Sequence, residues 1–324
     1  MSELALIERI AARTAVRPGT TLGIGDDAAV VEIGGSVVAT HDMLVEGVHF
    51  RLGTTTMRAL GARAVAVNLS DLAAMGAEPV ALLVGLGLPR GFTDDGRADD
   101  LTAAVEDAAA AHEVAVVGGD VTNSPHLVIG ITALGRPVPG VAPLRRSGGR
   151  PGDLLVVTGA LGASVAGLAL LEDPDLLPGL GERDALVAAH RVPVPRLAAG
   201  RELAAGGAHA MLDLSDGLAL DAGRLALASA ARARIDLSRI PLAPGVAVVA
   251  DALARDATVM AATGGEDYEL LAAVPADRLT ALRAALDVPL TVVGELEEGA
   301  PGAVLVDGDG APVVPSSPGW EHDV

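Results

Sequence analysis

The sequence predicts an α/β protein that is divided into two domains. Short apolar runs alternate with stretches of helical character along the whole chain, which is typical of strands alternating with helices. The 324 residues exceed what one compact core usually holds, since domains average about 150 residues. A stretch rich in proline and glycine interrupts the alternation between Gly135 and Gly152. Because proline restricts its own backbone and that of the preceding residue, we place the boundary there, giving domains 1–137 and 138–324.

Apolar runs predict the strands in order. In the first half they lie at Ala29–Ile33, Val37–Thr40, Ala81–Leu88, Val114–Val117 and Leu127–Leu134. In the second half they lie at Leu154–Val157, Met211–Leu214, Arg234–Leu237, Leu270–Val274, Thr291–Leu296 and Ala303–Val306. Helices are predicted between them, at Met57–Val67, Asp94–His112, Ala163–Leu170, Arg196–Ala205, Leu218–Ala230 and Asp277–Leu286.

Two segments bear on whether the chain is exported or inserted in a membrane. The start, Met1 to Arg17, mixes charged and apolar residues and predicts an amphipathic helix rather than a signal peptide. Leu154 to Leu171 has no charge and reaches the length of a membrane span, about 18 residues. Its Leu-Leu-Val-Val run, the Thr158-Gly159 turn and the small residues that follow instead predict a buried strand, turn and helix. We expect a cytoplasmic protein without a membrane partner.

Composition and charge exclude several function classes. Hydrophobic residues make up 50% and charged residues 20%, which is a globular composition. The 23 basic against 42 acidic residues give a net charge of -19, which argues against a nucleic-acid partner. The chain has no lysine, so a Walker loop is excluded. It has no cysteine, which excludes disulfides, thiolate metal sites and cysteine nucleophiles.

Six patches repeat one design, an acidic residue at the end of an apolar strand or the start of a helix, beside Gly, Ser or Thr. They are Gly23-Ile24-Gly25-Asp26-Asp27, Thr40-His41-Asp42, Asn68-Leu69-Ser70-Asp71, Gly118-Gly119-Asp120, Asp213-Leu214-Ser215-Asp216-Gly217 and Gly264-Gly265-Glu266-Asp267. Each patch taken singly also fits a structural role, because Asp71, Ser215 and Asp216 could cap helices and the Gly-Asp pairs could form turns.

Taken together, the patches predict a site for a magnesium–nucleotide complex. Strand ends on one edge of a sheet converge, and ligands of α/β proteins bind at such edges. Converging carboxylates repel one another unless cations neutralise them, and oxygen ligands suit Mg²⁺. The neighbouring glycines allow a phosphate to approach the backbone closely.

The residue order in these patches resembles motifs of the thiamine-monophosphate kinase family, which belongs to the superfamily of aminoimidazole-ribonucleotide synthetase. The matching runs, in order, are Gly23-Ile-Gly-Asp-Asp-Ala28, Asp42-Met-Leu-Val-Glu-Gly-Val-His-Phe50, Ala66-Val-Asn-Leu-Ser-Asp-Leu-Ala-Ala-Met-Gly76, Gly118-Gly-Asp-Val-Thr122, Arg146-Ser-Gly-Gly-Arg-Pro-Gly-Asp153, Asp213-Leu-Ser-Asp-Gly-Leu218 and Gly264-Gly-Glu-Asp-Tyr-Glu-Leu270. The resemblance extends from about residue 3 to the C-terminus. It implies two α/β domains, each a mixed β-sheet covered by helices. The N-terminal domain would bind ATP and Mg²⁺ and form a homodimer, and the C-terminal domain would complete the active-site cleft.

The implied reaction is transfer of the ATP γ-phosphate to thiamine phosphate, which gives thiamine diphosphate and ADP and requires several Mg²⁺ ions. The implied metal ligands are Asp27, Thr40, His41, Asp42, Asp71, Asp120, Asp213 and Asp216. Contacts to ATP are implied for Gly119, Asp120, Arg146 and Ser215, and contacts to the substrate for His49, Glu266, Asp267 and Trp320. His41 departs from the family pattern, which usually has a small hydroxyl residue there. A metal contact through its backbone carbonyl would tolerate the imidazole, whereas a required hydroxyl would make the site different.

The sequence also allows other roles for two of these residues and for the whole protein. Arg146 could be an ordinary surface arginine, and Trp320 could only pin the C-terminal tail to the surface. The whole protein could be a binding module for nucleotide or thiamine phosphate without catalysis, or another ATP-dependent enzyme of the same superfamily. A selenophosphate synthetase normally uses a reactive Cys or selenocysteine near its start, and this chain has no cysteine.

Overall fold

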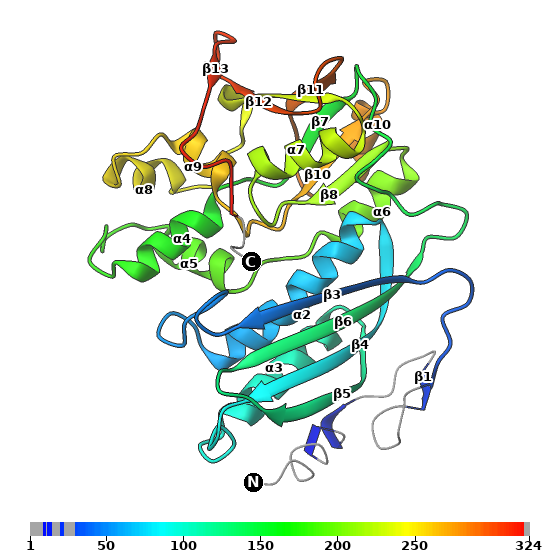
Figure 1. Cartoon of the computed structure of the whole chain (residues 1–324), viewed down its shortest axis with the longest axis vertical. Coiled ribbons are helices and arrows are strands. Elements are labelled where there is room, and N and C mark those ends of the chain that lie inside the picture. Colours follow the sequence, from blue (N-terminus) through cyan, green and yellow to red (C-terminus); the bar gives the residue numbers. More distant parts are fainter. Residues whose placement is uncertain (1–8, 11, 15–19, 23–29, 321–324) are drawn as a thin grey trace. The chain divides into compact units, whose positions relative to one another are not determined.

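The protein is described here by a computed structural model that covers residues 9–10, 12–14, 20–22 and 30–320 (Figure 1). These residues belong to two compact units. The N-terminal unit contains the residues up to Leu72 together with Ala77–Pro137, and the C-terminal unit contains Ala73–Gly76 together with the residues from Val138 onward. The sequence pattern did not anticipate that Ala73–Gly76 would join the second unit.

The N-terminal unit is built on a four-stranded sheet in the order β3-β6-β4-β5. In this order β3 and β5 are the edge strands. Strands β4 and β5 are parallel, and the other two pairs are antiparallel. A separate pair, β1 with β2, is antiparallel. The elements are β1 (Thr20–Leu22), β2 (Val30–Val31), β3 (Val38–Val45), α2 (Met57–Ala74), β4 (Ala77–Leu88), α3 (Arg97–Ala111), β5 (Ala115–Asn123) and β6 (Val128–Pro137).

The two faces of this sheet have different environments. Helices α2 and α3 cover one face (Figure 1), and side chains such as Ile129 and Ile131 are buried there. Side chains alternate between faces along a strand, so the intervening residues point to the other face. On that face Met43 is 50% exposed and Leu83 is 37% exposed. Val31 of β2 packs against Ala81 and Ala115 on this sheet. We call the exposed part around Met43 and Leu83 the uncovered face.

The C-terminal unit contains a seven-stranded sheet in the order β13-β12-β9-β11-β7-β10-β8. Only β12 and β9 are parallel among its pairs. Its strands are β7 (Leu154–Thr158), β8 (Ala210–Asp213), β9 (Arg232–Asp236), β10 (Leu270–Val274), β11 (Leu290–Glu297), β12 (Gly302–Val306) and β13 (Pro312–Val313). Its helices are α4 (Ala163–Glu172), α5 (Arg183–Arg191), α6 (Leu197–Ala205), α7 (Leu218–Ala228), η1 (Leu237–Arg239), α8 (Val246–Ala252), α9 (Ala257–Thr263) and α10 (Leu279–Ala285).

The core of the C-terminal unit consists of aliphatic side chains. Leu155, Val157 and Ile235 are fully buried in the main cluster between the sheet and α7. A second cluster lies among α4, α5, α8 and α9, where Leu170 and Val249 are buried. Ala, Val and Leu side chains therefore fill the core in place of aromatic residues.

The predicted strand, turn and helix at Leu154–Leu171 is confirmed as β7 followed by α4. Among the described residues, no helix combines the length and hydropathy that a membrane span requires. Two predicted strand ends are wrong, because β3 continues to Val45 and β5 continues to Asn123. The predicted helix end at Val67 is also wrong, because α2 continues to Ala74. Helices α5, α8 and α9 and strands β1 and β13 were not predicted.

Candidate active site

Strand β3 and helix α2 bring four polar side chains together in the N-terminal unit. The Thr40 hydroxyl donates a hydrogen bond to the Asp71 carboxylate. The backbone N–H of Asp42 donates to Oδ1 of Asn68 at 3.0 Å. Residues two apart on a strand share a face, as do residues three apart on a helix, so the two pairs oppose each other. We call these four residues the β3–α2 group.

Helix α2 contributes the one fully buried member of this group, and the other three residues are half-buried. Asn68 is 1% exposed, and its side-chain amide donates to the carbonyl of Ala64 at 2.9 Å, one turn earlier in the helix. Asp71 lies inside α2 rather than at its start. The alternative reading of Asp71 as a helix cap is therefore wrong. Both of its neighbours in the group, Thr40 and Asp42, lie inside β3 rather than at its end.

The structure does not bring the His41 imidazole to the β3–α2 group. His41 pairs with Thr132 of β6, on the uncovered face of the sheet. Its Nδ1 lies 2.9 Å from the Thr132 hydroxyl, and the side chain is exposed. The imidazole thus lies away from the group, and a metal contact through the His41 backbone stays a prediction.

Gly119 and Asp120 lie on β5, at the opposite edge of the same sheet from β3. Adjacent strands are about 4.8 Å apart, so three spacings place the two edges roughly 14 Å from each other. Asp42 and Asp120 therefore lie on the two outer strands of this sheet, and a ligand shared by the strand carboxylates stays a prediction. The reading of Gly119-Asp120 as a turn is wrong, because both residues are paired with β4.

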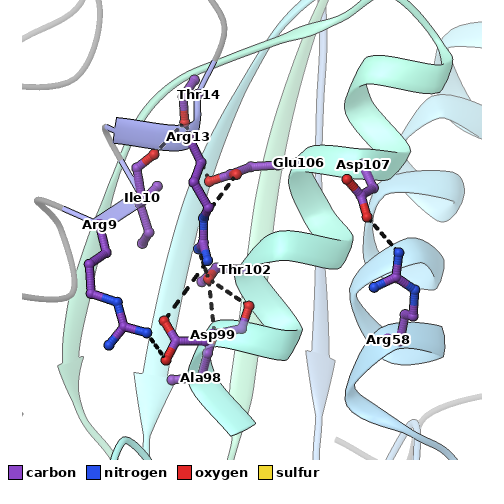
Figure 2. Close-up of polar contacts among 10 residues, drawn as sticks. All are labelled: Arg9, Ile10, Arg13, Thr14, Arg58, Ala98, Asp99, Thr102, Glu106 and Asp107. Atoms are coloured by element: carbon purple, nitrogen blue, oxygen red, sulfur yellow. Dashed lines mark hydrogen bonds and ion pairs between the residues drawn. The ribbon is translucent and has the colours of Figure 1, made fainter. Parts of the chain in front are cut away.

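A mainly apolar pocket adjoins Gly119 and Asp120. Its lining residues come from the N-terminal segment, α3, β4 and β5, and are Ile10, Val84, Leu86, Thr102, Val105, Glu106, Val116, Gly118, Gly119, Asp120 and Val121. Figure 2 shows the polar contacts that hold the N-terminal segment against α3. Arg13 donates to Thr102 Oγ1 at 2.7 Å and its Nε lies 3.3 Å from Glu106. Burial raises the pKa of Glu106.

His49 lies in the turn that follows β3. Its Nδ1 accepts a hydrogen bond from the backbone N–H of Val45 at 3.0 Å, and its own N–H donates to the Val45 carbonyl at 2.9 Å. The side chain is half-buried. Strand β3 ends at Val45, three residues after Asp42, so the turn that carries the predicted substrate residue follows the half of β3 that carries the predicted metal ligand.

In the C-terminal unit, three segments meet at the end of β8. Asp213 is the last residue of that strand and is 5% exposed. The Ser215 carbonyl accepts from the backbone N–H of Glu266 at 2.7 Å. The Asp216 carbonyl accepts from the backbone N–H of Trp320 at 3.0 Å. These bonds bring Asp213, Ser215, Asp216, Glu266 and Trp320, all predicted from the sequence, into one cluster.

A guanidinium that sequence reasoning missed contacts this cluster. Arg224 of α7 donates to the carboxylates of Asp216 and Asp221, the latter at 2.7 Å. Asp221 also accepts from the backbone N–H of Asp216 at 3.0 Å. Burial raises the pKa of Asp221 to about 6. Helix α7 begins after Gly217 with no side-chain cap, so the reading of Ser215 and Asp216 as caps is wrong.

Asp267 is directed to the start of α4. Its carboxylate accepts from the backbone N–H groups of Gly162 at 2.7 Å and Ser164 at 3.1 Å. These bonds favour the anion, as does a helix N-terminus. Burial has the larger effect and raises the pKa of Asp267 to about 7.

Because of this raised pKa, Asp267 is expected to make stability fall as pH rises. The unfolded chain releases the proton near 3.8, whereas the folded chain retains it up to about 7. Between these values the folded state binds more protons, so the free energy of unfolding declines and then levels off above about 7. Urea unfolding from pH 4.5 to 8 should show this decline in the wild type and a smaller one in Asp267→Asn. Parallel curves for the two proteins would contradict the assignment.

Arg146 lies in the segment that precedes β7. Its carbonyl accepts from the Ser229 hydroxyl at 3.0 Å, and that hydroxyl accepts from the Gly149 N–H at 3.1 Å. The Arg146 side chain is exposed. The main chain is thus fixed by the Ser229 hydroxyl while the guanidinium faces solvent.

Asp27 lies outside the described residues. Within the part of the chain that is described, no three His, Asp or Glu side chains converge in an arrangement that could hold a metal ion. Five of the predicted ligands fall into two smaller sets, with Thr40, Asp42 and Asp71 in the β3–α2 group of one unit and Asp213 and Asp216 in the cluster at the end of β8 in the other. The side chains of His41 and Asp120 lie outside both sets.

Comparison with known proteins assigns the chain to a family. Residues 25–136 match AIR synthase related protein, N-terminal domain, and residues 150–307 match AIR synthase related protein, C-terminal domain. The thiamine-monophosphate kinase of Escherichia coli K12 is 37% identical over an alignment of 332 residues, covering 99% of this chain and 98% of that protein. The chain belongs to the thiamine-monophosphate kinase family.

Solved structures of thiamine-monophosphate kinases agree with this membership. The enzyme from Stenotrophomonas maltophilia K279a has a TM-score of 0.83 at 36% identity, covering 97% of this chain and 98% of that one. AaThiL complexed with AMPPCP and TMP has a TM-score of 0.76 at 28% identity, covering 98% and 95%. The predicted fold class, two domains with mixed sheets and flanking helices, is confirmed.

Three further residues near these sets were not predicted from the sequence. They are Arg196, Arg224 and Glu269. Arg224 follows Asp221 by three residues on a predicted helix, a spacing that favours an ion pair and could have been read. Arg196 and Glu269 pair across 73 positions, and no local pattern indicates that contact.

Proposed function

We propose that this chain transfers the γ-phosphate of ATP to thiamine phosphate, giving thiamine diphosphate and ADP. The observation that carries the proposal is the match to thiamine-monophosphate kinases along nearly the whole chain. The similar protein AaThiL was solved with AMPPCP and TMP, which supports an ATP-like molecule and TMP as the two ligands.

The chemistry requires charge neutralisation more than proton transfer. A phosphomonoester has its second pKa near 6, so the acceptor oxygen of thiamine phosphate is already largely anionic at pH 7. Phosphoryl transfer depends mainly on positioning and on neutralising the developing charge. Two polyanions must meet in a protein with a net charge of -19 and no lysine. The chain therefore needs positive charge from cations and from its arginines.

The donor set fits Mg²⁺. Asp42 and Asp71 offer carboxylate oxygens on facing elements, and the Thr40 hydroxyl already contacts Asp71. Mg²⁺ in proteins is usually held by one or two carboxylates plus substrate phosphates and water. We propose the same role for Asp120, Asp213, Asp216 and Asp27, and a backbone contact for His41. When bound, the ions would supply the charge that lets the two phosphate groups approach.

We place the nucleotide against β5. The apolar pocket beside Gly118–Asp120 suits a nucleobase, since such sites are mostly apolar with a few polar groups. Gly119 and Asp120 then lie where the phosphates begin. Ser215 and the exposed guanidinium of Arg146 are proposed as further phosphate contacts, because guanidinium pairs two donors with phosphate oxygens.

The thiamine side is proposed to involve Glu266, Trp320 and His49. Glu266 is half-buried and carries the charge that would offset a cationic ring. Trp320 is 57% exposed beside Asp216, and an exposed indole stacks well on a cation. The Asp267 carboxylate is engaged by α4, so its contribution to the substrate is expected through the loop rather than directly.

We further propose that the active form is a homodimer joined through the uncovered face of the N-terminal sheet. An exposed sheet face that carries large apolar side chains is typical of an interaction site. Met43 lies on this face and is 50% exposed. Met43→Asp should convert the wild-type dimer to a monomer in analytical ultracentrifugation. Val314→Asp, at a residue that is 90% exposed in the other unit, should leave the dimer intact. A monomeric wild type would contradict the proposal.

The function is tested by mixing the purified full chain with ATP, Mg²⁺ and thiamine phosphate and following thiamine diphosphate by chromatography. Formation of thiamine diphosphate and ADP in equal amounts is the expected result. Binding of thiamine phosphate without any product, across a range of Mg²⁺ and K⁺ concentrations, would favour a non-catalytic binding module instead. Neither binding nor product would exclude both functions.

A further inference from the structure

Glu269 is a buried carboxylate with a complete set of partners. It is 3% exposed and lies just before β10. The Thr158 hydroxyl at the end of β7 donates to its Oε2 at 2.6 Å. Arg196, just before α6, donates from Nε to Oε2 at 2.7 Å and from Nη2 to Oε1 at 2.5 Å. A planar guanidinium that binds both oxygens fixes the orientation of a carboxylate more firmly than a single bond does.

The backbone at Gly159 leaves room for the Glu269 carboxylate. Gly159 has φ +60, and a Cβ atom built there would overlap the Glu269 carboxylate. Leu270, next to Glu269, donates its N–H to the Thr158 hydroxyl at 2.8 Å. Any side chain at position 159 would therefore displace the carboxylate from its partners. The seat consists of Thr158, Gly159 and Arg196, and we call it the Glu269 seat.

The loop before Glu269 is strained. Glu266 has φ +68 and Tyr268 has φ +51, a region that side-chain-bearing residues rarely adopt. Each such residue costs of the order of 1–3 kcal/mol and persists only where its surroundings impose it. Two strained residues flanking Asp267 thus need strong anchors. The Glu269 seat is one anchor, and the start of α4, which binds Asp267, is another.

The same loop carries the proposed substrate contacts. The N–H groups of Glu266 and Tyr268 donate to the carbonyls of Ser215 and Leu214 at 2.7 and 2.9 Å. The position of Glu266, and its distance from Ser215, therefore depend on where residue 269 is fixed. Arg196 acts on the loop from α6, through a contact that spans 73 positions in the sequence.

We propose that Arg196 is a positioning residue for the thiamine-phosphate site, acting through Glu269 on the loop 264–268. This inference rests on the proposed function. The guanidinium holds the Glu269 carboxylate, the carboxylate holds the strained loop, and the loop presents Glu266. Arg196 itself touches no reacting atom.

Two variants of the full chain test the seat by different means. Arg196→Gln removes the fork that binds Glu269, and Gly159→Ala removes no charge but fills the space that the carboxylate needs. Each has a matched control in the same unit. Arg232→Gln breaks a half-exposed pair with Glu297, whose N–O distance is 2.8 Å. Gly207→Ala introduces the same backbone strain at φ +88, with nothing within 4 Å of the new methyl group.

The first readout is amide hydrogen exchange of residues 264–268, which needs no ligand. We expect exchange about tenfold faster in Arg196→Gln and Gly159→Ala, with exchange in β10 unchanged and both controls like the wild type. The second readout is the Kd of thiamine phosphate by calorimetry, expected to rise about tenfold in the same two variants. If Arg196→Gln does not fold because Glu269 is left charged and unpaired, the double variant Arg196→Gln with Glu269→Gln replaces it.

The two readouts separate the inference from the proposed function. A wild type that binds no thiamine phosphate would overturn the function, while faster exchange in the loop would still support the seat. Unchanged exchange and an unchanged Kd in folded Gly159→Ala and in the Arg196 variant would overturn the positioning role. A lower melting temperature with neither change would assign Arg196 to global stability only.

Discussion

Alanine at Asp42 or at Asp120 is expected to remove nearly all turnover while leaving the chain folded. Removing one group that stabilises developing charge typically costs about 10²–10³ in kcat, and loss of a metal ligand belongs at the upper end. Asp42 is half-buried and Asp120 is exposed, so neither substitution opens a large cavity in the core. The measurement is the rate of thiamine diphosphate formation, with circular dichroism and thermal unfolding as the check on folding.

The position of each aspartate makes the comparison informative. Asp42 belongs to the β3–α2 group, and Asp120 lies at the opposite edge of the sheet. Glu295→Ala is the matched control, because Glu295 is also an exposed acid within a strand but has no proposed role in the site. Loss of activity in both variants and full activity in the control is expected. Wild-type rates in both Asp42→Ala and Asp120→Ala would refute the mechanism that depends on these carboxylates.

A second large effect is expected at Gly119, where alanine should destabilise the N-terminal unit. A Cβ atom there would overlap the carbonyl oxygen of Val84 on the neighbouring strand, so the pairing of β4 with β5 must shift. Forcing an extra carbon into well-packed surroundings costs about 1–3 kcal/mol, and a clash with backbone lies at or above the top of that range. Urea unfolding should show a loss of about 3 kcal/mol in the free energy of unfolding.

The adjacent glycine is the control for this prediction. A Cβ atom on Gly118 would lie 3.2 Å from Cδ2 of Leu83, which is the flexible end of a side chain that is 37% exposed. Gly118→Ala should therefore cost much less than Gly119→Ala. Equal losses for the two variants would show that the approach of Gly119 to Val84 is not the limiting contact. Gly119 is thus explained by strand packing as well as by its proposed contact with phosphate.

Sequence patterns located most elements but misplaced several ends. The strand Leu270–Val274 is predicted with its observed bounds, because all five residues are buried and apolar. Strand β3 was predicted to end at Thr40, since His41 and Asp42 interrupt the apolar run. The strand nevertheless continues, because His41 faces the uncovered side and the Asp42 N–H has a partner in Asn68. Asn68 and Ser70 interrupt the apolar run of α2 in the same way, although both side chains are buried.

The sequence by itself determined the alternation of strands and helices, the family and the acidic patches, because each of these is written in short stretches of neighbouring residues. Only the tertiary structure decided which patches meet. Strand order placed Asp42 and Asp120 on opposite edges of one sheet, and distant segments brought Trp320 to Asp216 and Arg196 to Glu269. Local pattern fixes the type of an element through burial and backbone preference, whereas pairing between distant segments depends on which surfaces the whole chain can bury together.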